Sequence, residues 1–445
     1  MQNKLVDEKK WISQERFLQA LGYCMLLPGP EALQLSIYLG WLLNGVLGGI
    51  IAGVLFVLPG VIALLALSSL YLAAGTTALV TGLFLGLAPA VVAIVIQAVR
   101  KVAGRALFHP ALIGIAIASF LALTLFNLPF PVVVLAAAGA GWLLRKRITP
   151  DAAGGADTGP TDPTETGFAD ADPTEAGFTE ADPTEAGFTE ADPIEARSVG
   201  APSASKRPSL GTVAKLLLIG LPLWLAPIGI AAAAARGTSV FTDLGLFFAR
   251  AALVTFGGAY AVLAYVASQA TAVGWLAPGE MVHGLAMAET TPGPLITVVQ
   301  FVGFVGAFRH PGSLNPWVAA FLASLLVAWV TFVPSFFFIF IGAPFAERLR
   351  NNRQLAAALA GITAAVVGII ANLAVFFALH NLFTQQVTHR FGPIQLTLPV
   401  LTSVNPVAIA IAAVASVLIF KFKWSTLKVI GVCVVLGMAA VLLLG

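Results

Sequence analysis

Apolar runs of twenty or more residues recur along almost the whole chain, and they constrain its fold more than any other feature. A run of about 20 apolar residues spans a bilayer as a helix, because every backbone N–H and C=O in lipid must be paired within the segment. Of the 445 residues, 58% are hydrophobic and only 10% are charged. We therefore predict an all-α polytopic membrane protein.

Ten apolar segments are uninterrupted, and two longer ones each contain the sequence Pro-Gly-Pro. Because proline and glycine interrupt a regular helix, residues 14–43 and 278–308 are predicted to be broken helices. Together these segments predict about 12 membrane crossings. The uninterrupted segments are residues 44–70, 77–99, 106–126, 129–144, 212–235, 243–268, 316–341, 355–379, 399–420 and 424–444.

Residues 145–210 break the apolar pattern with a decapeptide repeat that is rich in Pro, Gly and acidic residues. Thirteen of the 21 Asp and Glu residues of the chain lie between positions 150 and 200. A segment of this composition cannot bury a core. We predict a disordered acidic linker between two halves, and a partner-binding tail is the alternative.

The two halves resemble each other in sequence. An offset of 264 residues aligns the two Pro-Gly-Pro sequences, and after an insertion an offset of 275 residues aligns Pro59 with Pro334. Internal duplication is the economical explanation. We predict a first transmembrane repeat at residues 1–144 and a second at residues 241–445.

The charges of the short loops predict that these repeats are inverted. Lys and Arg collect in cytoplasmic loops, and the loop at 71–76 is uncharged whereas its counterpart, AERLRNN, is basic. An odd connecting helix at 211–240 would allow the inversion, which is typical of secondary transporters. A helix at 247–266 precedes Trp275, but only ten residues precede Trp11. The first repeat is therefore predicted to lack its first helix, unless the true start lies upstream.

Three long motifs carry a resemblance to a known family: LLPGPEALQLSIYLGWLLNGVLGGIIAGVLFVLPG (26–60), TFGGAYAVLAYV (255–266) and GLAMAETTPGPLITVVQFVGF (284–304). They closely resemble the chromate ion transporter family, in its long-chain form, and the resemblance covers essentially all of the chain outside the linker. It implies export of chromate across the bacterial inner membrane and chromate resistance, with sulfate as the related oxyanion. The chain departs from the family pattern because its first half lacks an FGG helix and because it carries the acidic linker.

The Pro-Gly-Pro sequences predict a seat for an anion. Proline suits the first turn of a helix, where its missing N–H would be unpaired, and glycine lets the chain bend sharply before it. Each sequence would start a helix at membrane depth, and its free N–H groups and positive dipole end contribute about 0.3–1 kcal/mol to anion binding. Inversion would bring the two ends together around a tetrahedral dianion. A pair of packing kinks is the alternative.

Neutral hydroxyl and amide groups, Ser36 among them, would complete this seat, unless the hydroxyls bond back to their own helix carbonyls. The predicted substrate-binding residues are Pro28, Gly29, Pro30, Glu31, Gln34, Tyr38, Arg250, Gly257, Gly258, Tyr260, Glu289, Thr290, Thr291, Pro292, Gly293, Pro294, Thr297 and Gln300.

Two glutamates are the hardest residues to explain as scaffold. A carboxylate at the centre of a membrane helix costs about 2.5–3.5 kcal/mol, so it is expected to have a partner or a task. Glu31 follows its turn, where the helix dipole would stabilise it, so capping is an alternative for this residue. Glu289 precedes its turn and has no such support. We predict that one or both take up a proton or pair with an arginine during transport.

Candidate counter-charges are Arg250, Arg16 and Lys215, because a cation, and above all a guanidinium fork, matches oxyanion oxygens. Snorkelling to the interface is the alternative for each. The glycines of FGGAY permit close helix packing or local unwinding. His283 is a candidate proton relay.

Other classes of protein find little support in the sequence. Cys24 and Cys433 are isolated, and the histidines do not cluster, so we predict no disulfide, metal or cofactor. The spans contain no Ser-His pair, paired catalytic Asp or HExxH motif, so we predict no enzyme. The predicted partners are chromate, with sulfate, another oxyanion or an organic anion as alternatives, and the lipid bilayer. Nucleic acid is not a predicted partner, and a homodimer stays open.

Overall fold

The computed structural model describes residues 1, 3–74, 77–148, 210–235, 239–255, 259–277, 279–342, 352–392 and 394–444. This part is mostly helical, with one two-stranded β-hairpin. Six of its helices are long and apolar enough to cross a membrane: Glu31–Ala74, Val80–Ala106, Leu216–Ala234, Pro316–Gly342, Arg353–Leu382 and Thr426–Leu443. The prediction of a helical membrane protein is thus confirmed. Most of the predicted linker, residues 149–209, lies outside the described residues.

The first Pro-Gly-Pro segment folds back on itself instead of continuing as one broken helix. Helix α1 (Gln14–Cys24) is followed by a turn and by α2 (Glu31–Ala74), and Tyr23 contacts Tyr38 with ring centroids 5.6 Å apart. Helix α2 reverses again at Asn44 and Gly45, where the backbone leaves the helical region. Two arms of α2, residues 31–43 and 46–74, therefore run antiparallel.

Two contacts establish this reversal of α2. A Cβ added to Gly40 would lie 2.5 Å from the carbonyl oxygen of Gly48, and the Ser36 hydroxyl donates to the carbonyl of Ala52 at 3.2 Å. Residues eight and sixteen positions apart in a continuous helix would be separated by about 12 and 24 Å. The glycines let the two arms touch through their backbones.

The second Pro-Gly-Pro segment has the same form. Helix α10 (Glu280–Thr290) is followed by the turn, by the short 3₁₀ helix η4 (Leu295–Thr297) and by α11 (Val298–Arg309). Arg309, at the end of α11, pairs with Glu280, at the start of α10. Both ends of the segment thus lie at the same end of a helical hairpin, before α12 (Pro316–Gly342) begins.

Glycine explains why the chain reverses at both Pro-Gly-Pro sequences. Gly29 has φ +124° and Gly293 has φ +131°, a region that other residues rarely adopt. Both segments are interrupted at the Pro-Gly-Pro sequence, as predicted, but the chain also reverses there, which the sequence pattern did not indicate. We call α1 with residues 31–43 the first hairpin, and α10 with α11 the second hairpin.

The predicted span 243–268 is also divided. Helix α8 (Val240–Val254) and α9 (Ala259–Ala272) are separate, and Phe247 of α8 packs on Tyr265 of α9 with ring centroids 5.0 Å apart. Each residue lies well away from the break, so the two helices run side by side as a third hairpin. The glycines of FGGAY, residues 257 and 258, lie outside the described residues.

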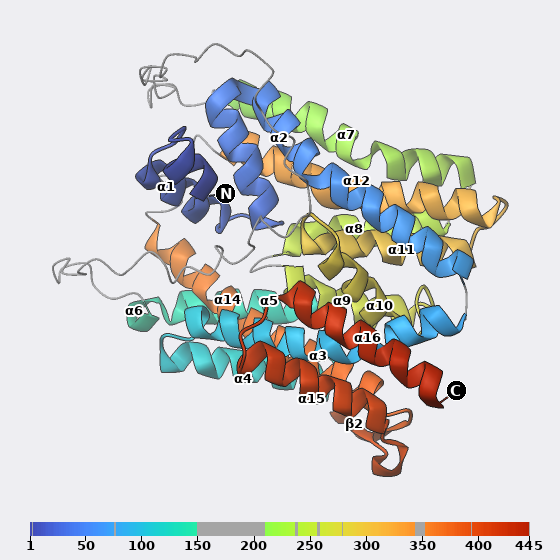
Figure 1. Ribbon diagram of the computed structural model, residues 1–445. Helices are drawn as coiled ribbons and strands as arrows, with labels where there is room; N and C mark the ends of the chain where they lie inside the picture. Colours follow the sequence, from blue (N-terminus) through green and yellow to red (C-terminus); the bar gives the residue numbers. More distant parts are fainter. Residues whose placement is uncertain are drawn as a thin grey trace, which may run out of the picture.

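The remaining helices form two groups around these hairpins (Figure 1). In Figure 1, α7 lies with α2 and α12 along the top, α8 to α11 occupy the middle, and α3 to α5 lie with α14 to α16 below. Their bounds are α3 Ala78–Ala106, α4 Pro110–Phe126, α5 Phe130–Leu143, α6 Arg145–Ile148, α7 Leu210–Ala235, α14 Arg353–Leu382, α15 Pro406–Phe420 and α16 Thr426–Leu444. Helix α6 occupies the first four residues of the predicted linker, and a π-helix, Asn3–Glu8, precedes α1.

The predicted span 399–420 begins too early. Strands β1 (Gln386–Phe391) and β2 (Ile394–Pro399) pair as an antiparallel hairpin, with Gln386 opposite Pro399. Helix α15 begins only at Pro406. Asn405 caps α15 by accepting a hydrogen bond from the backbone N–H of Ala408 at 3.1 Å. Of the predicted span, Pro399 ends β2 and the 3₁₀ helix η6 (Leu401–Ser403) precedes this cap.

Glycines bring helices of the two halves into close contact in the lower group. A Cβ added to Gly437 of α16 would lie 2.6 Å from the Cα of Gly86 in α3. A Cβ added to Gly361 of α14 would lie 2.9 Å from the Cα of Gly141 in α5. Small residues on both helices allow such approach, as in other membrane helix pairs.

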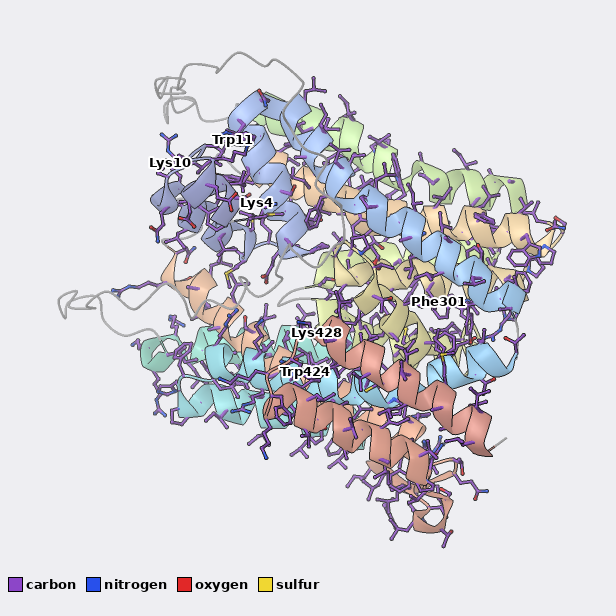
Figure 2. The ribbon with its side chains drawn as sticks, in the orientation of Figure 1. Lys4, Lys10, Trp11, Phe301, Trp424 and Lys428 are labelled. Carbon is purple, nitrogen blue, oxygen red and sulfur yellow. The ribbon has the colours of Figure 1, made fainter. Side chains whose placement is uncertain are left out.

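Helix α11 is the centre of the molecule. Residues 298–307 are all buried, and Phe301, whose position Figure 2 labels, is fully buried among the surrounding helices. In contrast, Lys4, Lys10 and Trp11 lie at one end of the molecule (Figure 2). The second hairpin thus places α11 in the interior of the protein.

Candidate functional site

The Pro-Gly-Pro turns are the centre of the candidate site. We call residues 28–30 the first turn and residues 292–294 the second turn. The backbone N–H of Gly29 donates to the carbonyl of Thr255 at 2.7 Å, so the first turn lies against the end of α8, at the first residue of the motif TFGGAYAVLAYV. Two motifs that are far apart in the sequence are thereby brought together.

Each turn packs against a long helix of the other half. A Cβ added to Gly29 would lie 3.0 Å from the hydroxyl of Ser335 in α12. A Cβ added to Gly60 in α2 would lie 2.8 Å from the carbonyl of Pro292 in the second turn. Neither glycine has room for a side chain, so both close approaches depend on glycine. Sequence reasoning did not identify Ser335, although it follows the aligned Pro334.

Two fully buried glutamines follow the turns. The amide Nε2 of Gln34 donates to the carbonyl of Pro28 at 2.6 Å, and that of Gln300 donates to the carbonyl of Val61 at 3.0 Å. Among the described residues, neither Oε1 has a hydrogen-bond partner. A buried polar atom without a partner is uncommon in folded proteins. Each Oε1 could accept a hydrogen bond from a water molecule, from a ligand or from a side chain that changes position. A free hydrogen-bond acceptor among the described residues therefore follows each turn.

The two glutamates have different partners. Glu289, which is half-buried near the end of α10, accepts a hydrogen bond from the hydroxyl of Tyr260 in α9. This bond joins the third hairpin to the second. Glu31 is the first residue of α2, in the position that the helix dipole stabilises, and it interacts electrostatically with Arg105 of α3. Both residues thus have a polar or charged neighbour.

Several predicted residues take a structural part. The hydroxyls of Thr290 and Thr291 donate to the carbonyls of Met287 and Ala288 at 2.8 and 3.0 Å. The alternative of bonding back to the helix therefore holds for these two threonines. Tyr38 packs between the rings of Tyr23 and Trp41, with centroids 5.6 and 5.7 Å away. Its ring belongs to an aromatic cluster of the first hairpin.

The predicted residues differ in their exposure. Pro292 and Gly293 are exposed at the second turn, whereas Pro294 and Thr297 are buried behind it. Gly29 and Pro30 of the first turn are buried and Pro28 is half-buried. The candidate cations Arg250 and Arg16 are exposed on α8 and α1, away from the buried face of each helix. Gly257, Gly258 and the side chain of Lys215 lie outside the described residues.

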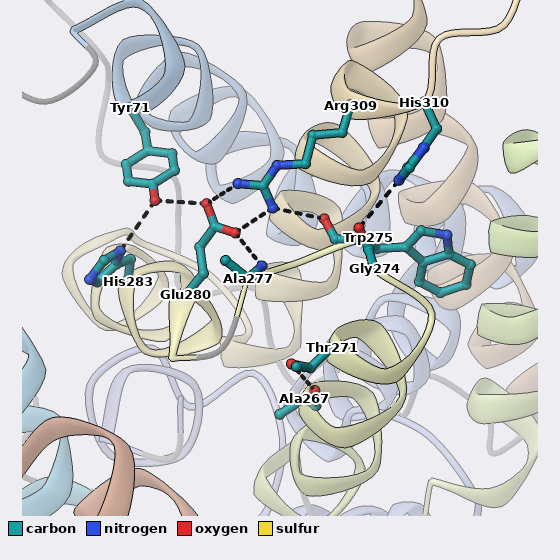
Figure 3. Close-up of polar contacts among 10 residues, drawn as sticks. All are labelled: Tyr71, Ala267, Thr271, Gly274, Trp275, Ala277, Glu280, His283, Arg309 and His310. Carbon is teal, nitrogen blue, oxygen red and sulfur yellow. Dashed lines mark hydrogen bonds and ion pairs between the residues drawn. The ribbon is translucent and has the colours of Figure 1, made fainter. Parts of the chain in front are cut away.

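A polar cluster that sequence reasoning missed closes the base of the second hairpin (Figure 3). The guanidinium of Arg309 donates to both carboxylate oxygens of Glu280, at 2.7 and 3.0 Å. The same carboxylate accepts from the backbone N–H of Ala277 and from the hydroxyl of Tyr71, both at 2.8 Å. Glu280 is only 5% exposed, so these four donors compensate its burial.

The cluster extends to His283 and defines its protonated nitrogen. An ionised carboxylate only accepts, so the Tyr71 hydroxyl donates its hydrogen bond to Glu280, and the Tyr71 oxygen then accepts one from Nδ1 of His283 at 3.3 Å. Glu280 and Arg309 lie at opposite ends of one interrupted apolar segment. That spacing was the available signal, because two opposite charges at the ends of a hairpin meet at its base.

The described residues contain no group of three or more His, Cys, Asp or Glu side chains that could hold a metal ion. The groups at the turns are helix ends, amides and hydroxyls, which can bind and release a ligand, and two carboxylates, which can exchange protons. Such a set suits a ligand that must bind without being held permanently.

Comparisons with known proteins point to one family. The model of a family described as chromate transporter matches residues 1–142 and 242–438. The chromate transport protein of Pseudomonas aeruginosa is 29% identical over 372 residues, which cover 83% of this chain and 73% of that protein. A probable chromate transport protein of Synechococcus elongatus is 25% identical, covering 86% of this chain and 80% of that protein. The chromate transport protein of Cupriavidus metallidurans is 24% identical, with coverage of 85% and 76%. No solved structure matches the chain.

Proposed function

The chain belongs to the chromate transporter family, and from this premise we propose that it exports chromate across the inner membrane of a bacterium and so gives chromate resistance. It is a multi-pass membrane protein of a transporter family. The observation that carries the proposal is that each Pro-Gly-Pro turn packs against a long helix of the other half, Gly29 against Ser335 and Pro292 against Gly60, and that a fully buried glutamine follows each turn.

The substrate would lie between the two turns. The first N–H groups of α2 and of η4 with α11 follow the turns, and each helix end carries a partial positive charge. Amide and hydroxyl groups around them would replace the water molecules of the oxyanion's hydration shell. Because these donors are uncharged, the oxyanion could also leave. Chromate and sulfate share shape and charge, so this geometry supports either anion, and the family membership favours chromate.

Reciprocal contacts support an inverted-repeat arrangement. If two repeats are related by a two-fold axis and residue i of the first contacts residue j of the second, then residue j of the first also contacts residue i of the second. With the two offsets, Gly29 matches Gly293 and Gly60 matches Ser335, and the contacts are Gly29 with Ser335 and Gly293 with Gly60. Helix α3 likewise packs on α15 and α16, while α14 packs on α4 and α5.

The crossing of α2 and α12 agrees with the same axis. Gly49 lies against Phe340 and Gly53 against Phe336, so the helices run antiparallel. Continued along both helices, these pairs meet at Val57 and Phe332, which are 275 residues apart. The offset that aligns the repeats thus also pairs the residues at the crossing, as expected where a helix meets its own counterpart.

Membrane potential favours export. The cytoplasm is negative, so moving a dianion outward gains about 2.3 kcal/mol per charge for each 100 mV. Glu289 would add a proton to the cycle, because a bare carboxylate beside the second turn repels an incoming dianion. Tyr260 would hold the carboxylate in place while its charge changes. Coupling to a counter-anion is the alternative.

Everted membrane vesicles test the proposal. Chromate uptake into vesicles that contain the protein is expected to exceed uptake into control vesicles and to increase with an inside-positive potential. An imposed pH gradient and competing sulfate separate proton coupling from anion preference. Absence of chromate-dependent flux under all of these conditions would contradict the proposal. Transport of sulfate that is faster than that of chromate would identify sulfate as the preferred substrate.

A further inference from the structure

A cavity of about 360 Å³ lies beside the base of the second hairpin, between α2, α3, α10, α14 and α15. Its volume is within the range of about 300–1,000 Å³ that is usual for small-molecule sites. Its polar lining consists of Tyr71, Thr81, His283, His380, Asn381 and Asn405. The proposed seat at the turns lies at the other end of α10, so this end cavity is a separate place.

The wall of the end cavity presents hydrogen-bond donors. The Oδ1 atom of Asn405 is occupied as the cap of α15, because it accepts from the N–H of Ala408 at 3.1 Å. Its amide NH₂ group is therefore the part left for the cavity. Thr81 adds a hydroxyl, and Asn381 adds an amide whose Nδ2 reaches the carbonyl of Ala88 at 3.4 Å.

The electrostatic surroundings favour an anion. No Asp or Glu belongs to the described lining of the cavity. The nearby carboxylate of Glu280 is neutralised by the two-point pairing with Arg309. Helices α3, α10 and α15 all begin at this place, and their first turns carry partial positive charge.

The two imidazoles form firm side walls. His283 is bonded to Tyr71 through Nδ1 and packs on Phe84 with ring centroids 4.1 Å apart. His380 donates from Nδ1 to the carbonyl of Phe376 at 2.8 Å and packs on the same residue. His283 is thus held by its neighbours in the wall, Tyr71 and Phe84, and His380 by Phe376, which lies outside the lining, so both rings are fixed as parts of the wall.

We propose that the end cavity is a second binding site for the transported oxyanion, at the membrane face where the second hairpin has its base. The uncharged loop at 71–76 predicts that this face is external, so the site is where the anion is released after passing the turns. Asn405 would donate to it directly. The inference rests on the proposed function, because it assumes that a tetrahedral oxyanion is carried.

Asn405→Asp is the decisive variant. Asp caps a helix as well as Asn does and has nearly the same shape, so α15 should be retained while a negative charge enters the cavity. We expect the KM for chromate presented from the external face to rise by roughly tenfold or more through repulsion. The KM from the cytoplasmic face should stay within about twofold, because the turns are unchanged.

Asn352→Asp is the matched control. Asn352 caps α14 through the same Oδ1 atom, accepting from Gln354 and Leu355 at 3.0 and 3.2 Å, and it does not line the cavity. Its KM should equal that of the wild type from both faces. Asn405→Ser keeps a capping oxygen but removes the amide donor, and it should raise the external KM several-fold. This variant replaces Asn405→Asp in the test if the Asp variant fails to fold.

Right-side-out and everted vesicles with radiolabelled chromate give the two KM values. An unchanged external KM in Asn405→Asp and Asn405→Ser would overturn the second site while wild-type flux still supports chromate transport. An equal rise in the control, or from both faces, would also overturn it, because the effect would then come from a general loss of structure. Absence of wild-type flux would instead contradict the proposed function.

Discussion

Glu289 is the residue on which the proposed coupling depends. Its only hydrogen bond among the described residues comes from Tyr260, and no basic side chain is paired with it there. We expect Glu289→Gln to reduce chromate flux and to flatten its dependence on pH, because an amide cannot exchange a proton. Flux in vesicles at several pH values measures this.

Glu8→Gln is the control for this prediction, since Glu8 is exposed before α1. Tyr260→Phe should keep a pH-dependent flux but shift the pH at which the flux changes. The Glu289 carboxylate would lose its hydrogen-bond donor but could still bind and release a proton. Full activity of Glu289→Gln with the wild-type pH profile would remove the glutamate from the transport cycle.

The ion pair at the base of the second hairpin makes a prediction about stability. Arg309→Met would leave the nearly buried carboxylate of Glu280 with only Tyr71 and Ala277 as donors. We expect a loss of about 1–3 kcal/mol, less than for a fully buried pair, because Arg309 is 36% exposed. Thermal unfolding in detergent measures the loss, and Arg390→Met, on an exposed strand, should leave the midpoint unchanged. Equal midpoints for all three proteins would argue against a stabilising pair.

At the scale of elements, the turns make the sharpest prediction. Gly29→Ala faces a backbone cost of about 1–3 kcal/mol at its positive φ and contacts with Gln34 and Ser335. We expect it to abolish chromate flux. Gly392→Ala is the matched control, because Gly392 also has a positive φ, +61°, but has no atom within 4 Å of its added Cβ. Normal flux in Gly29→Ala would show that the close approach is not required.

The elements also show what the sequence could and could not predict. Apolar length predicted the long helices, because lipid requires continuous backbone pairing. It did not predict the hairpins, because a reversal and an interruption leave the same proline and glycine in the sequence. The sign of φ at Gly29 and Gly293 and the meeting of Glu280 with Arg309 distinguish them, and both depend on tertiary packing.

At the scale of the molecule, the two proposed repeats are related by two sequence offsets. They matched Gly60 with Ser335 and Gly86 with Gly361, positions where the two halves touch. The partners themselves could not be predicted, because an offset says which residues are equivalent and not which are in contact. The offsets do not point to the cluster of Tyr71, Glu280 and Arg309, whose one signal in the sequence is the placement of Glu280 and Arg309 at the two ends of one segment.

The reciprocal helix contacts predict matched effects in the two halves. Gly86→Leu and Gly361→Leu should each destabilise the protein, because each side chain would enter a backbone contact, with α16 or with α5. Gly114→Leu, where the added Cβ has no atom within 4 Å, should be tolerated. Thermal unfolding in detergent compares the three, and tolerance of either of the first two variants would contradict close packing at that crossing.

Chromate flux through the purified protein in liposomes tests the central claim most directly. Liposomes loaded with chromate and given a potential that is negative inside should release it faster than protein-free liposomes, and Gly29→Ala should behave like the protein-free control. The release should slow when the potential is collapsed, because the dianion then loses its driving force. Release that is no faster than from protein-free liposomes, with the protein shown to be folded and inserted, would contradict the account.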